Sequence, residues 1–264
     1  VDWREATGPC RARHLAESLW AGEGFFLQLD SHMRFASGWD TAMLRWLEAA
    51  EAASTFGKAV LSSYPPGYEG SGAAAELPDD HRPTLLCASH FGPDDGLLRI
   101  QGRRLRDPPV DEEPLRSLFW AAGLSFSRSQ LIKEAPYNPH LPLLFFGEEM
   151  ERLARMWTAG WDVFAPPKSI VFHLWSRSNR PTFTATVPAD PVVKNSSQEA
   201  VRRFLAGEPC LCGAAAGPME GFPLGQRRSL QDFYAFCGVD FASGAIQPWA
   251  LLGGESLQES SFCP

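Results

Sequence analysis

Apolar positions along the first two thirds of the chain follow two different periods. Helical spacing of apolar residues predicts helices over residues 9–21, 39–53 and 147–160. Short apolar runs predict strands at residues 25–29, 58–64, 84–91, 96–100, 163–167 and 170–175. Because strands and helices alternate, the pattern predicts an α/β fold in which helices cover the faces of a sheet.

Two of these elements allow more detailed expectations. The run from Phe25 to Leu29 is almost continuously apolar, which is typical of a strand buried on both faces. The helix at 39–53 is expected to have Asp40 as its N-cap and to bury Met43, Leu44 and Leu47.

Composition suggests one core with an appended segment. Residues 65–83 are rich in proline and glycine and read as a long loop, and residues 99–114 read as a charged connection. From about residue 180 the sequence becomes more polar and glycine-rich. We therefore expect a core at 1–180 and a C-terminal extension, residues 181–264, packed on it.

Charge and hydropathy exclude several classes of protein. The chain has 24 Lys and Arg against 31 Asp and Glu, a net charge of −7, so it lacks the general basic surface that binds nucleic acid or anionic lipid. No window approaches the roughly twenty apolar residues of a membrane-spanning helix. The six cysteines are scattered and are interpreted mainly as free thiols.

One small constellation has the chemistry of a metal site. Asp30 and His32 follow the strand at 25–29 and, in an extended backbone, would point to the same side. His173 lies on a second short apolar strand. A carboxylate and two imidazoles suit a divalent ion, and the two nitrogen ligands favour manganese over magnesium. The alternative is that Asp30 caps a turn and His32 is an ordinary surface histidine.

Three longer segments resemble a known family. They are LWAGEGFFLQLDSHMRFASGWD at 19–40, GEEMERLARMWTAGWDVFAPPKSIVFHLWSR at 147–177 and LGQRRSLQDFYAFCGVDF at 224–241. Together they resemble the glycosyltransferase (GlcNAc) family, whose best-known members add N-acetylglucosamine to hydroxyproline on a cytoplasmic protein. The resemblance implies UDP-GlcNAc as the donor, a protein or peptide hydroxyl as the acceptor, and a cytoplasmic location, with the Golgi or secretory pathway still open.

The wider pattern is similar to the polypeptide GalNAc-transferases. In both, a G-x-x-x-A-R helix precedes a strand that ends in D-S-H, as Gly8 and Arg13 precede Asp30 here. A G-E helix with an R-x-W motif and a later histidine follow. This resemblance implies a GT-A type, Rossmann-like core that is metal-dependent and retains the configuration of the sugar.

The resemblance also implies roles for individual residues. It places Mn²⁺, or alternatively Mg²⁺, on Asp30, His32 and His173. Catalytic roles fall to Glu148, Glu149 and Arg155, although acids in the first turn of a helix are also expected simply because they stabilise its dipole. Contacts to the substrates fall to Arg13, Gly123, Tyr137, Asn138, Trp157 and Arg177.

One departure from the family pattern leaves alternatives open. The sequence begins almost at the G-x-x-x-A-R helix, so we expect the core to lack the N-terminal units that hold the nucleoside. A non-catalytic remnant that acts as a binding module is therefore the main alternative. A metal-dependent hydrolase would explain the three metal ligands but not the ordered motifs.

Overall fold

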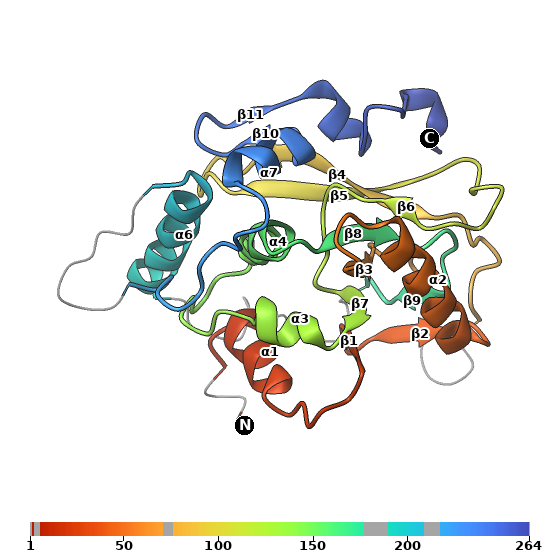
Figure 1. The fold of residues 1–264 in the computed structure, drawn as a ribbon, viewed down its shortest axis with the longest axis horizontal. Coiled ribbons are helices and arrows are strands. Elements are labelled where there is room, and N and C mark those ends of the chain that lie inside the picture. Colours follow the sequence, from red (N-terminus) through yellow and green to blue (C-terminus); the bar gives the residue numbers. More distant parts are fainter. Residues whose placement is uncertain (1, 3–5, 71–75, 177–189, 209–216, 264) are drawn as a thin grey trace.

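The computed structural model describes residues 2, 6–70, 76–176, 190–208 and 217–263 (Figure 1). Its helices are α1 (Pro9–Glu17), α2 (Trp39–Ala53), α3 (Gln130–Glu134), α4 (Glu148–Thr158), α6 (Pro191–Leu205) and α7 (Leu230–Cys237), with 3₁₀ helices at Pro248–Leu252 and Glu259–Ser261. Its strands are β1 (Phe25–Leu29), β2 (Met33–Phe35), β3 (Ala59–Ser62), β4 (Thr84–Phe91), β5 (Leu98–Arg104), β6 (Leu115–Arg116), β7 (Leu124–Arg128), β8 (Asp162–Ala165), β9 (Val171–His173), β10 (Val239–Asp240) and β11 (Ala245–Ile246). The chain thus has a mixed α/β fold.

A five-stranded sheet in the order β1-β7-β3-β8-β6 forms the centre of the molecule. Only β3 and β8 pair in parallel, and the other neighbours are antiparallel. Along β3, Ala59 and Leu61 pack in one apolar cluster with α2, whereas Val60 packs in another with α4. Because alternate residues of a strand point to opposite faces, α2 and α4 cover the two faces of this sheet.

The structure corrects three details of the sequence-based picture. Strand β1 is an edge strand, and Phe25 is 38% exposed, so it is not buried on both faces. Helix α2 has Gly38 as its N-cap, with Asp40 in its first turn. Leu44 is exposed, while Trp46 is buried in its place beside Met43 and Leu47. Packing against neighbouring segments thus decides which residues of β1 and α2 are buried.

The charged connection predicted at residues 99–114 is shorter than expected, because its first part belongs to a strand. Strand β5 extends to Arg104, because it pairs along its whole length with β4, from Leu98 opposite Phe91 to Arg104 opposite Thr84. This pairing satisfies backbone groups of a segment whose charged side chains suggested a loop.

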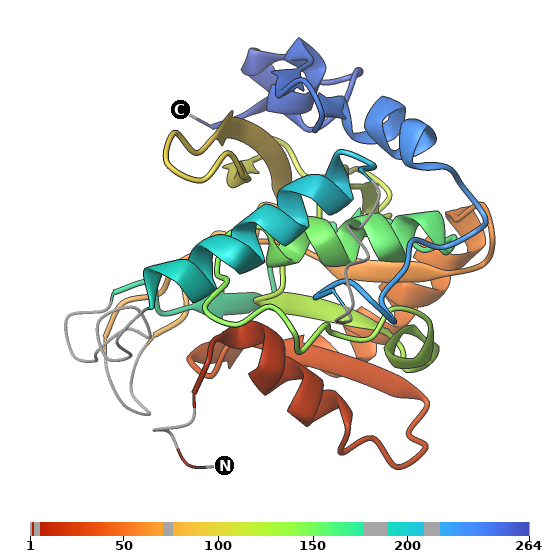
Figure 2. The same cartoon turned by 90° about the vertical axis from the view of Figure 1, so that its left-hand side faces the viewer.

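Helices α6 and α7, which the sequence pattern did not predict, both pack on α4 (Figure 2). Val201 and Leu205 of α6 and Phe233 of α7 belong to the same apolar cluster as Leu153 and Ala154 of α4. The residues around the predicted boundary at 180 lie outside the described part of the chain, so that division stays a prediction. None of the described helices is long and apolar enough to cross a membrane.

Candidate active site

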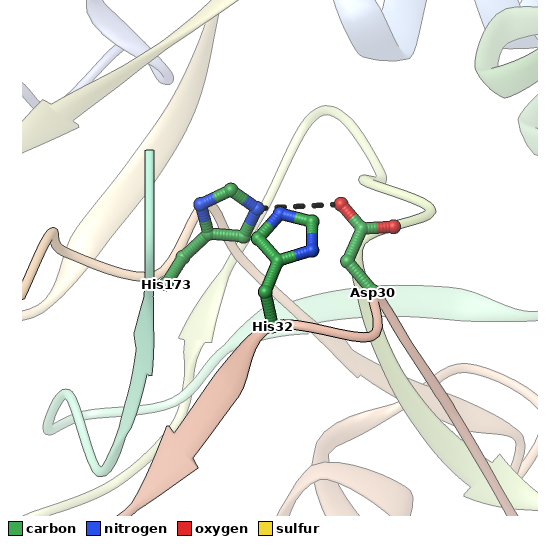
Figure 3. A group of neighbouring side chains, drawn as sticks. All are labelled: Asp30, His32 and His173. Atoms are coloured by element: carbon green, nitrogen blue, oxygen red, sulfur yellow. Dashed lines mark ion pairs between the residues drawn. The ribbon is translucent and has the colours of Figure 1, made fainter. Parts of the chain in front are cut away.

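Asp30, His32 and His173 come together, and each offers a ligand atom within 4.8 Å of the others (Figure 3). Strand pairing produces this convergence. Residues 31 and 32 form a turn after β1 instead of continuing it, and β2 then pairs with β9 so that Met33 lies opposite His173. The prediction of an extended backbone from Asp30 to His32 is therefore wrong. The three side chains nevertheless lie close together, as expected.

The charges in this cluster favour an ionised carboxylate. Oδ2 of Asp30 lies 3.4 Å from Nε2 of His173, and Oδ1 accepts a hydrogen bond of 3.4 Å from Arg13. The hydrogen bond from His173 and the positive charge of Arg13 lower the pKa of Asp30. Gly123 faces the same carboxylate, since a Cβ at this position would lie 3.3 Å from Oδ2. The glycine leaves room beside Asp30.

The donor set fits a divalent cation. Nε2 of His173 faces Oδ2 of Asp30 at 3.4 Å, so this ring nitrogen is on the side of the cluster where an ion would lie (Figure 3). One carboxylate and two imidazoles are a donor set that suits first-row divalent ions such as Mn²⁺. Within the described ranges, no other group of three His, Cys, Asp or Glu side chains meets the same criterion.

A cavity of about 290 Å³ opens beside the metal cluster. Its lining includes both ionisable and apolar side chains, and we call these two sets the ionic wall and the apolar wall. The ionic wall contains Arg13, Asp30, Glu148, Glu149 and His173. The apolar wall contains Met33, Leu98, Ile100, Phe145, Phe146 and Trp175. A ligand that fills this cavity therefore contacts both charged groups and hydrocarbon.

Arg13 on α1 is the central cation of the ionic wall. It donates hydrogen bonds to Glu148, to Asp30 and, at 3.2 Å, to the hydroxyl of Tyr137. The Tyr137 hydroxyl also accepts a hydrogen bond of 3.1 Å from Gln28. Tyr137 is 2% exposed and does not line the cavity, so it contacts Arg13 and not the cavity itself.

Two carboxyl groups begin α4 at the edge of the cavity. Burial raises the pKa of Glu148, although its ion pair with Arg13 acts in the opposite direction. Burial and the neighbouring charge of Glu148 raise the pKa of Glu149 to about 7. The amide of Ala122 donates to Oε1 of Glu149 at 2.8 Å, and the Tyr64 hydroxyl donates to Oε2 at 3.3 Å. Glu149 can therefore change protonation state near neutral pH.

Besides Tyr137, three further residues assigned to the site from sequence lie away from the cavity. Arg155 is buried and pairs with Glu151 at 2.6 Å. The Asn138 side chain donates to the carbonyl of Pro218 at 2.9 Å and accepts from a nearby backbone amide. Trp157 packs on Phe233 and Phe236 in the core. The contacts of these three side chains stabilise the fold. Arg177 lies outside the described residues.

Sequence reasoning missed two aromatic side chains that line the cavity. Tyr64 follows β3 and reaches Glu149, and Trp175 follows β9, with its ring 3.9 Å from the ring of His173. The indole of Trp175 also donates a hydrogen bond of 3.1 Å to the carbonyl of Pro65. Tyr64 and Trp175 are the last residues of the strands predicted at 58–64 and 170–175, so their positions at strand ends were the available signal.

Sequence reasoning also missed a buried ion pair behind Arg13. Arg152 of α4 lies 2.5 Å from Glu17 of α1, and both side chains are almost fully buried. The guanidinium of Arg152 also lies 3.9 Å from the centre of the Tyr137 ring. These contacts hold α1, which carries Arg13, against α4, which carries Glu148.

Of the comparisons with known proteins, the match to a family model agrees with the sequence resemblance. A search of curated proteins finds no match. The solved structure of GalNAc-T7 with UDP, GalNAc and Mn²⁺ superposes with a TM-score of 0.48 and 17% identity over 87% of this chain. The chain spans 41% of that protein's length. The family model described as glycosyltransferase (GlcNAc) matches residues 1–243, most of the sequence. The chain therefore belongs to the glycosyltransferase (GlcNAc) family.

Proposed function

We propose that this glycosyltransferase moves N-acetylglucosamine from UDP-GlcNAc to a hydroxyl group on a protein or peptide, on a GT-A type core and with retention of configuration. The observation that carries the proposal is the convergence of Asp30, His32 and His173 beside a cavity whose ionic wall includes Arg13. A divalent cation and a fixed guanidinium are both groups that bind a diphosphate.

Asp30, His32 and His173 are the residues that would hold the metal ion, most plausibly Mn²⁺ and alternatively Mg²⁺. Once bound, a divalent cation supplies positive charge that stabilises the negative charge growing on the departing UDP. Asp30 contributes a carboxylate that is already ionised, because His173 and Arg13 lower its pKa. Gly123 leaves the space next to that carboxylate open.

Arg13 is the residue that would bind a phosphate oxygen directly. Its guanidinium is held by Glu148, Asp30 and Tyr137, so little side-chain freedom is lost when an anion binds. Charge-assisted hydrogen bonds from arginine to phosphate are among the stronger polar contacts in proteins. The same contacts leave Arg13 on the cavity wall beside the metal cluster.

Glu149 is the carboxyl group best placed to contact the transferred sugar. Its two oxygens are held by the Ala122 amide and the Tyr64 hydroxyl, and it lines the cavity next to Glu148. As a carboxylate it accepts hydrogen bonds from sugar hydroxyls, and it stabilises positive charge that develops on the sugar ring. We further propose hydroxyproline as the acceptor and the cytoplasm as the location, on the family resemblance alone.

The proposal is tested by following UDP release from UDP-GlcNAc, with Mn²⁺ or with a chelator, and with or without a hydroxyproline peptide. We expect release that requires the metal and increases with the peptide. Asp30→Asn should abolish it. His90→Ala, an exposed histidine on the β4–β5 hairpin, is the matched control and should behave as the parent. Metal and donor binding without any release would instead favour the non-catalytic binding module.

A further inference from the structure

Two adjacent aromatic side chains form part of the cavity wall and remain largely open to solvent. Phe145 and Phe146 are 48% and 47% exposed, and both line the cavity that contains Glu149. Their rings meet edge to face, with centres 5.1 Å apart. We call this pair the aromatic rim. An apolar ligand in the cavity would bury these two exposed rings, and burying each ring is favourable.

The aromatic rim is held in place before any ligand binds. Arg99 of β5 stacks on Phe146 with its guanidinium carbon 3.7 Å from the ring centre. The carboxylate of Asp95 forms an ion pair with the Arg99 guanidinium, at 2.7 Å. Gly147, with a φ of 100°, turns the backbone from the rim into α4, and a Cβ there would lie 3.0 Å from a methyl group of Leu97. A preorganised surface loses little entropy when it binds.

The position of the rim indicates which substrate it contacts. Leu98 and Ile100 of β5 line the same cavity as the two rings. The donor's diphosphate and sugar hydroxyls need hydrogen bonds and charge, which the ionic wall offers and hydrocarbon does not. The apolar wall therefore has no polar partner to offer the donor. It suits a second substrate whose reactive hydroxyl sits beside apolar groups.

We propose that the aromatic rim binds the acceptor and selects peptides in which an apolar side chain neighbours the hydroxyl-bearing residue. This inference rests on the proposed glycosyl transfer to a protein or peptide. In such a complex the apolar neighbour covers Phe145 and Phe146, while the hydroxyl faces the ionisable side chains of the same cavity. Aromatic side chains in well-packed contacts commonly dominate binding energy, so truncating one of them has a measurable effect.

The test compares two hydroxyproline peptides that differ only in having leucine or glycine on both sides of the hydroxyproline. Binding of each labelled peptide to the full chain is followed by fluorescence anisotropy in the presence of Mn²⁺ and UDP, and transfer is followed as UDP release. We expect the leucine peptide to bind about tenfold more tightly than the glycine peptide, and Phe145→Ala to remove most of that difference.

Phe25→Ala is the matched control. Phe25 is also exposed and also stacked by an arginine, Arg128, which is held by Glu51, but it does not line the cavity. It should keep the full preference for the leucine peptide. Equal binding of both peptides by the parent, or an unchanged preference in Phe145→Ala, would overturn the inference. Failure of UDP release with both peptides would refute the proposed transfer, while the binding measurement would still decide whether the rim selects apolar peptides.

Discussion

The hydroxyl of Tyr64 lies 3.3 Å from one carboxylate oxygen of Glu149, at the point where the end of β3 meets the start of α4. Glu149 is thus a half-buried carboxyl group with two neutral donors, Tyr64 and the Ala122 amide, and a like charge next to it at Glu148. Burial and that like charge outweigh the donors, and the pKa is raised to about 7 from an ordinary value of 4.5.

The raised pKa of Glu149 predicts a specific dependence of stability on pH. Between pH 4.5 and about 7 the folded chain keeps a proton on Glu149 that the unfolded chain releases. The unfolding free energy contributed by this group is therefore present below pH 4.5 and is lost as pH rises to about 7. Glu149→Gln should make the fall in stability across this window shallower, as measured by urea unfolding at several pH values.

The control for this experiment is Glu48→Gln, because Glu48 is exposed on α2. It should leave the slope of unfolding free energy against pH unchanged. An identical slope for the parent and Glu149→Gln would show that Glu149 does not carry a raised pKa in the folded chain.

Tyr64→Phe should change the pH profile of the reaction itself. The Tyr64 hydroxyl stabilises the carboxylate form of Glu149, so its removal raises the pKa of Glu149 further. If the carboxylate is the working form, UDP release rises with pH through about 7 in the parent, and the rise occurs at higher pH in Tyr64→Phe. Rates measured over the whole pH range check this. A loss of rate with no movement of the rise would mean that Tyr64 acts on the substrate and not through Glu149.

The metal cluster shows what sequence could and could not predict. Asp30 and His32 were identifiable because two metal-binding residue types follow an apolar strand, and His173 because it lies on another. Their convergence depends on the turn at residues 31 and 32 and on the pairing of β2 with β9, which no local pattern encodes. Arg155, in contrast, pairs with Glu151 four residues earlier on the same helix, a local contact that its sequence spacing could have indicated.

Helix α6 illustrates a local signal that was overlooked. Asp190 accepts a hydrogen bond from the amide of Val192, and Pro191 takes the first helical position, which together mark the start of a helix. Val201 and Leu205, four residues apart, form its buried side. The polar and glycine-rich sequence around it hid this pattern. Tyr64 and Arg152, in contrast, acquire their roles only through partners far away in the sequence.

Metal binding by the cluster can be measured without any turnover. A ligand that binds only the folded state raises the temperature of unfolding, so Mn²⁺ should stabilise the parent chain. Asp30→Asn should remove most of this stabilisation while leaving the metal-free chain about as stable, because the Asp30 side chain is 36% exposed. Thermal unfolding with and without Mn²⁺ gives both values. Equal stabilisation of the parent and Asp30→Asn would place the metal elsewhere, and His90→Ala again serves as the control.

Residues 225–228 form hydrogen bonds to the C-terminal end of α4, the helix that begins with Glu148 and Glu149. The amide of Gly225 donates to the Thr158 hydroxyl at 2.7 Å. The amides of Arg227 and Arg228 both donate to the carbonyl of Thr158, at 2.9 and 3.1 Å. These bonds satisfy groups at the C-terminus of α4 that the helix itself leaves unpaired.

Gly225→Ala should therefore loosen this attachment. A Cβ at residue 225 would lie 2.1 Å from the backbone nitrogen of Ala159, so the two backbones must separate. We expect a loss of about 2 kcal/mol or more in unfolding free energy, measured by urea unfolding. Gly24→Ala is the matched control, because a Cβ there meets nothing within 4 Å, and its effect should stay within about 0.5 kcal/mol. Equal stability of the two variants would show that residues 225–228 do not hold the end of α4 in solution.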